Sequence, residues 1–104
     1  MAVLQETKLT LGASNNGSDT DALQLFQTAT KVFVKFGDGV SGTLTYKEGI
    51  DEEHLINRSV PEADAWNATI TASTVFMVSG PGVIAFGCAD TTGEIEIVIE
   101  ESMN

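Results

Sequence analysis

The residues of this chain that could do chemistry are few, and most of them lie in one acidic segment. The single histidine, His54, follows Glu52 and Glu53, with Glu48 and Asp51 close by. Carboxylates and an imidazole can hold a divalent metal, so a site through His54, Glu52 and Glu53 is one interpretation. The spacing matches no calcium loop of the EF-hand type, and a lone histidine has no companion ligand of its kind nearby. We therefore prefer a solvated acidic loop and expect no required metal.

Other catalytic arrangements are also missing from the sequence. The sole cysteine, Cys88, sits in the run FGCA, where a small thiol usually packs as a hydrophobic group. The sequence contains no GxSxG, GxxxxGK, HExxH or CxxC motif. We expect a protein that is not an enzyme and that uses no cofactor.

Three aromatic residues, Trp66, Tyr46 and Phe86, offer a different kind of site. If they lay outward and side by side, they could form a platform on which sugar rings stack. Trp66 begins a run whose alternate members are apolar, and alternating apolar positions usually face a core. Exposure of Trp66 and Tyr46 would favour carbohydrate binding, whereas burial would favour a scaffold role.

The clearest pattern is the stretch TTGEIEIVIEES near the C-terminal end of the sequence. Its isoleucines alternate with Glu94, Glu96, Val98 and Glu100, and a period of two is the period of a β-strand. The carboxylates should meet solvent or a partner, with no catalytic or metal-binding role. The apolar face should enter a core that contains Ile95, Ile97, Ile99, Val32, Val34, Leu44 and Ile70.

Length and charge narrow the class of protein. The 104 residues suffice for a single domain with its own core, residues 1–104. Fifteen acidic and five basic residues give a net charge of −10, which repels phosphate backbones and disfavours nucleic-acid binding. The longest apolar run, Val83 to Ala89, is far shorter than the ~20 residues of a membrane helix. The first residues lack the pattern of a secretory signal, so we expect synthesis and folding in a cytoplasm.

Most of the chain reads as strands separated by turns. The pattern predicts an all-β domain, a β-sandwich or jelly roll of about seven to eight short antiparallel strands. Asp38-Gly39 lies between two alternating runs and predicts a hairpin that joins Lys31–Phe36 to Val40–Tyr46. Gly80-Pro81-Gly82 is typical of a type II turn.

Residues 1–21 are expected to form an N-terminal strand or arm followed by a mobile loop. Val3, Leu9 and Leu11 share one face of Ala2–Leu11, while Gly12–Asp21 is rich in turn-forming residues. The arm has too few apolar residues to anchor itself, so we expect it to pair with a neighbouring subunit. Deleting Met1–Leu11 should then lower the oligomeric mass.

The order of these elements resembles a family of known proteins. A strand SGTLTYKEGID is followed by a polar loop with Trp66, and then by STVFMVSGPGVIAFGCADTTGEIEIVIE. This order resembles small β-sandwich structural proteins of tailed bacteriophages, which include head decoration (cement) proteins, fibre domains and tail adaptors. The chain departs from their pattern in its last strand, which carries Glu where such domains often carry Thr.

The resemblance implies a virion protein, made in the host cytoplasm, that binds and stabilises the assembled head. The implied partner is the major capsid protein or another virion protein, and the implied form is a homo-oligomer, with a trimer favoured. The alternative is a carbohydrate- or receptor-binding module of a phage tail or fibre. The candidate interface residues are Val3, Leu4, Leu9, Leu11, Glu94, Glu96 and Glu100.

Overall fold

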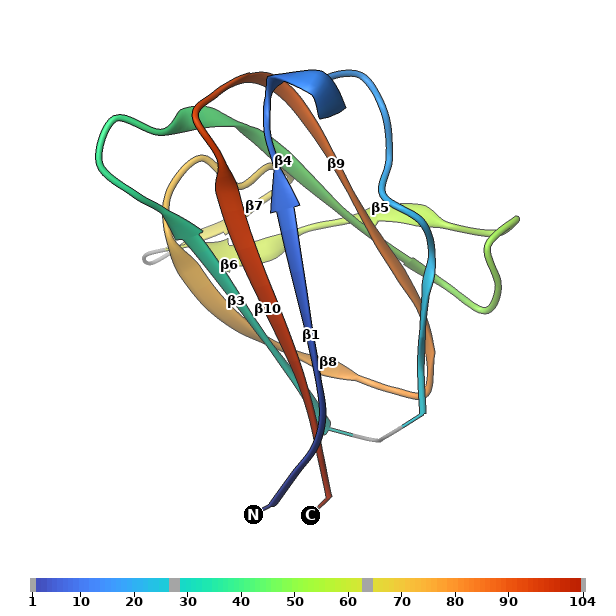
Figure 1. Ribbon diagram of the computed structural model, residues 1–104. Helices are drawn as coiled ribbons and strands as arrows, with labels where there is room; N and C mark the ends of the chain where they lie inside the picture. Colours follow the sequence, from blue (N-terminus) through green and yellow to red (C-terminus); the bar gives the residue numbers. More distant parts are fainter. Residues whose placement is uncertain (1, 27–28, 63–64, 104) are drawn as a thin grey trace.

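Two four-stranded antiparallel sheets pack face to face and confirm the predicted all-β sandwich (Figure 1). The computed structural model describes residues 2–26, 29–62 and 65–103. The first sheet has the order β1-β10-β3-β8 and the second has the order β2-β9-β4-β5, while β6 and β7 form a small pair of their own. The strands are β1 (Ala2–Leu11), β2 (Leu23–Leu25), β3 (Ala29–Phe36), β4 (Ser41–Gly49), β5 (Ile56–Arg58), β6 (Val60–Glu62), β7 (Ala65–Asn67), β8 (Thr74–Ser79), β9 (Gly82–Thr92) and β10 (Ile95–Met103), and a short 3-10 helix, η1 (Ala13–Asn15), follows β1.

The strand pairing is that of a jelly roll. The chain doubles back on itself, so that β1 pairs with β10, β2 with β9, β3 with β8 and β4 with β5. This long double strand is then rolled up, which brings β3 beside β10 and β4 beside β9. Eight strands in two sheets is the usual content of this fold, and the β6–β7 pair is an addition between β5 and β8.

The hairpin predicted around Asp38-Gly39 is wrong. A turn does form there, with the Val40 N–H bonded to the Gly37 carbonyl at 3.1 Å and Gly39 at a φ of 76°. The flanking strands, however, lie in different sheets, because β3 pairs with β10 and β8 while β4 pairs with β9 and β5. The Asp-Gly sequence predicts a turn, but it does not determine which strands pair. In the jelly roll the two strands that flank this turn belong to different sheets.

The turn at Gly80-Pro81-Gly82 also differs from the prediction. The Gly80–Pro81 peptide bond is cis, and the glycines with positive φ are others, so this is not a type II turn. The tertiary amide before a proline makes the cis form accessible at low cost. The turn still joins β8 to β9 as expected.

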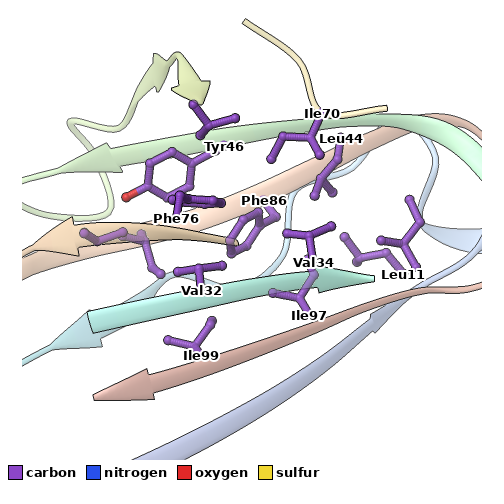
Figure 2. Packing of buried hydrophobic residues seen from close by; sticks show 14 of the residues in the cluster. Leu11, Val32, Val34, Leu44, Tyr46, Ile70, Phe76, Phe86, Ile97 and Ile99 are labelled. Atoms are coloured by element: carbon purple, nitrogen blue, oxygen red, sulfur yellow. The ribbon is translucent and has the colours of Figure 1, made fainter. Parts of the chain in front are cut away.

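The core fills the space between the two sheets (Figure 2). All seven side chains predicted for it are buried, with exposed fractions of 3% or less. Tyr46, Phe76 and Phe86 pack together in it, and the Tyr46 ring centroid lies 5.1 Å from that of Phe76 and 5.5 Å from that of Phe86. The free thiol of Cys88 is buried in the same cluster, as predicted.

The segment after β1, expected to be a mobile loop, is bonded to β9. The Gly17 N–H donates to the Cys88 carbonyl at 2.9 Å, and the Thr20 N–H donates to the Phe86 carbonyl at 2.7 Å. The Phe86 N–H returns a bond to Thr20 Oγ1 at 3.0 Å. This segment therefore continues the edge of the second sheet beyond β2.

Candidate interaction surface

The acidic strand β10 lies inside its sheet, between β1 and β3. Ile95, Ile97 and Ile99 point into the core, while Glu96 is exposed on the opposite face and Glu100 is half-buried there. These carboxylates do not protect a free sheet edge from pairing with another chain, because β1 and β3 pair with β10 on its two sides. They belong instead to the outer face of the first sheet.

Lysines on β3 lie directly opposite these carboxylates. Lys35 is the cross-strand partner of Glu96, and Lys31 is the partner of Glu100. Opposite charges in such positions attract, with a contribution of roughly 0.2–1 kcal/mol per pair. The Lys31 ammonium also lies 5.2 Å from the centroid of the Phe33 ring, which is a cation–π distance.

Between the two charged rows runs an apolar row. Val98 on β10 is opposite Phe33 on β3, which is opposite Val75 on β8. Val75 is 49% exposed, and Met77, two residues further along β8 and opposite Lys31, is 61% exposed. We call these four side chains, Val98, Phe33, Val75 and Met77, the apolar stripe. Val98, Phe33 and Val75 of this stripe line a shallow groove of about 530 Å³, together with Glu96, Glu100 and Lys35.

The edge strand β1 adds one charged side chain to the row of Glu100 and another to the end of the apolar row. Lys8 is the cross-strand partner of Val98, and Glu6 is the partner of Glu100. The Lys8 ammonium lies 3.6 Å from a Glu6 carboxylate oxygen. Strand pairing thus places Glu6, Lys8, Lys31, Lys35, Glu96 and Glu100 on one face.

This outer face is locally neutral on a strongly acidic molecule. It carries three of the five basic residues of the chain together with three acidic ones. The other two basic and twelve acidic residues leave the remainder of the chain with the whole net charge of −10. Sequence reasoning missed this gathering of lysines, although the alternation of Lys31, Phe33 and Lys35 placed them on one strand face.

Two of the leucines predicted for the interface, Leu9 and Leu11, face inward instead. Leu11 is 3% exposed in the core, and Leu9 is half-buried against it. The backbone of β1 pairs with β10 of the same chain along its length, so pairing with a neighbour is not needed to hold it. The side chains of Val3 and Leu4 lie outside the described part of the chain.

Glu94 lies away from the lysines, at one end of the sandwich. It is exposed in the β9–β10 turn, and Asp38 in the β3–β4 turn and Asp90 near the end of β9 are exposed at the same end. We call Asp38, Asp90 and Glu94 the acidic end. Asp90 has a φ of 54°, a left-handed conformation that Asp tolerates better than most residues.

The carboxylate of Asp51, close to His54, stabilises the β4–β5 turn through hydrogen bonds. Asp51 Oδ1 accepts a bond from the Glu53 N–H at 2.9 Å and lies 2.6 Å from His54 Nδ1. The hydrogen bond from His54 lowers the pKa of the Asp51 carboxyl. Glu48 is engaged elsewhere, since it accepts bonds from the Tyr46 hydroxyl and Arg58 Nε, both at 2.7 Å. Among the described residues, no group of three or more His, Cys, Asp or Glu side chains is arranged to hold a metal.

The proposed sugar platform does not form from Tyr46 and Phe86. Tyr46 is 3% exposed and Phe86 is fully buried, so neither ring faces solvent. Burial raises the pKa of the Tyr46 phenol. The side chain of Trp66 lies outside the described residues, although its backbone belongs to β7.

Comparisons with known proteins give a likeness of fold. No protein-family model matches the chain, and no curated protein matches it. A solved structure, that of the SPBc2 prophage-derived protein YomS, is similar with a TM-score of 0.64 and 13% sequence identity, over 98% of this chain and 99% of that one. The chain therefore has the fold of a prophage-derived protein along nearly its whole length. None of the helices in the described ranges is long and apolar enough to span a membrane.

Proposed function

We propose that this chain is a non-enzymatic structural protein of a phage virion, a decoration protein that binds and stabilises the assembled head. The observation that carries the proposal is the likeness of fold to a prophage-derived protein over 98% of this chain and 99% of that one. A jelly roll hosts many functions, so a second line of support is needed. The element order that resembles phage decoration domains points in the same direction.

The surface of the molecule suits attachment to a basic partner. Outside the neutral outer face the chain carries a net charge of −10, and the acidic end presents three exposed carboxylates, two on turns and one near the end of β9. Such a surface would be steered toward basic patches of a protein shell, chiefly by long-range attraction that raises the association rate. The major capsid protein is the proposed partner.

The carbohydrate-binding alternative loses its main support. Two of the three aromatic residues that would have formed its platform, Tyr46 and Phe86, are core residues. We therefore do not adopt it as a second proposal.

Co-sedimentation with heads that lack this protein tests the proposed attachment. At ~0.1 M salt, where the screening length is about 10 Å, we expect the chain to pellet with heads from the phage that encodes it. At ~1 M salt, where that length is about 3 Å, the bound fraction should fall. The variant Asp38→Asn/Asp90→Asn/Glu94→Gln should bind at least several-fold more weakly at the lower salt.

A control variant removes negative charge from a different exposed turn. The variant Glu52→Gln/Glu53→Gln loses two exposed carboxylates of the β4–β5 turn and leaves the acidic end intact. It should bind nearly as well as the unmodified chain. Failure of the unmodified chain to pellet at ~0.1 M salt would refute the proposed attachment. Equal binding by all three proteins would refute the role of the acidic end.

A further inference from the structure

The outer face of the first sheet is the part of this molecule that a second acidic copy can approach without repulsion. The rest of the chain carries the whole net charge of −10, and this surplus of carboxylates opposes association between like chains. On this face, the pairs Glu96–Lys35 and Glu100–Lys31 lie on either side of Val98 and Phe33. Glu6 and Lys8 lie beside them on β1. A contact here would bury exposed apolar surface and pair opposite charges at the same time.

We propose that two copies of the chain associate through this outer face, about a twofold axis that runs parallel to the strands between β10 and β3. Rotation about such an axis lays β10 of each copy over β3 of the other. Glu96 then faces Lys35 of the partner subunit, and Glu100 faces Lys31 of the partner subunit. The contact is isologous, so each of these pairs forms twice.

The alternative face-to-face axis is disfavoured by the same charges. A twofold axis across the strands would lay β10 over β10 and β3 over β3. Glu96 would then face Glu100 of the partner subunit, and Lys31 would face Lys35 of the partner subunit. Like charges placed directly opposite one another destabilise a contact, so the charged residues favour the axis that runs parallel to the strands.

The centre of the proposed contact is apolar. Phe33 faces Val98 of the partner subunit across the axis, and β8 with Val75 and Met77 lies over β1 of the other copy. Val75 and Met77 are 49% and 61% exposed in the single chain, so their side chains have surface left to bury. The flexible thioether of Met77 can adapt to the partner surface.

This contact closes on itself and predicts a dimer in solution. It therefore differs from the trimer that the resemblance to decoration proteins implies. The inference concerns the isolated chain and does not rest on the proposed attachment to heads.

Measurement of mass by sedimentation equilibrium tests the inference. At about 100 µM, chosen because a small sheet-face contact gives modest affinity, the chain should have about twice its mass of 11.0 kDa. The variants Lys31→Glu/Lys35→Glu and Glu96→Lys/Glu100→Lys should each sediment as monomers, because like charges then face one another across the axis. Their dimer affinity should fall by at least about tenfold.

Two further samples separate the proposed contact from damage to the fold. An equimolar mixture of the two charge variants should form a heterodimer, because every facing pair is again of opposite sign. The fourfold swap Lys31→Glu/Lys35→Glu/Glu96→Lys/Glu100→Lys should restore the homodimer, since it keeps opposite charges in both β10–β3 pairs and in every pair that faces the partner subunit. A monomer or trimer for the unmodified chain, dimers of either charge variant alone, or a mixture of folded variants that stays monomeric would overturn the inference.

Discussion

Replacing Ile97 by Asp is expected to abolish the folded state of this domain. Ile97 is fully buried in the core, and its cross-strand neighbours are Leu9 and Val34. The substitution deletes a large apolar side chain and leaves a carboxylate among apolar groups with no basic partner in the core cluster. Burying such a group costs several kcal/mol, which is comparable with the whole stability of about 5–15 kcal/mol of a small domain.

Denaturant unfolding followed by circular dichroism measures this effect. The control Ile97→Val keeps the site apolar and removes one methylene, so it should cost only about 0.5–1.5 kcal/mol and leave a cooperative transition. An Ile97→Asp protein that unfolds cooperatively at the same midpoint as the unmodified chain would mean that the buried and exposed faces of β10 are reversed.

Deleting residues 2–11 is expected to unfold the domain as well, rather than to release an intact subunit from an oligomer. The deletion removes β1, which pairs with β10 from Ala2 to Leu11, and it exposes the backbone of a strand that now lies inside its sheet. It also removes buried Leu11, whose burial alone contributes roughly 1.5–3 kcal/mol. This expectation replaces the lower oligomeric mass predicted from the sequence.

Loss of the cooperative thermal transition in the truncated chain is the expected readout. The matched control Glu6→Gln/Lys8→Gln changes two outward side chains of the same strand and should alter stability by no more than about 0.5 kcal/mol. A truncated chain that melts cooperatively near the temperature of the full chain would show that β1 is dispensable for folding.

Most features that the sequence predicted correctly followed from the alternation of apolar and polar side chains along single strands. Ile95, Ile97 and Ile99 entered the core as expected, because burial of one strand face depends only on a period of two. The all-β class followed from the spacing of strands and turns. These features are local, so a single sequence can indicate them.

Pairing between strands could not be predicted in the same way. The turn at Asp38-Gly39 suggested a hairpin, but its two strands belong to opposite sheets of a jelly roll. The charged outer face could not be predicted for the same reason. Lys8, Lys31 and Lys35 come together only because β1 and β3 pair with β10 on its two sides. Such arrangements depend on contacts between distant segments, which leave no short motif.

Placement of single residues failed where the face of a strand was ambiguous. Leu9 and Leu11 were predicted as contacts for a neighbour because the arm looked weakly apolar, yet strand pairing with β10 turns them toward the core. Glu101 shows the same ambiguity, although no position was predicted for it: it is 2% exposed, and one of its carboxylate oxygens accepts a bond from the Phe26 N–H at 2.9 Å. A buried carboxylate held by a backbone donor cannot be told from a surface one by its sequence alone.

The location of the chain in purified particles tests the proposed function most directly. Particles released from cells that carry the gene can be separated on a density gradient into heads and tails, and the chain can then be quantified by mass spectrometry and located by labelled antibody. A decoration protein is predicted to occur in the head fraction, in many copies distributed over the shell. Its presence only in tails, or its absence from the particles while it accumulates in the lysate, would contradict the account.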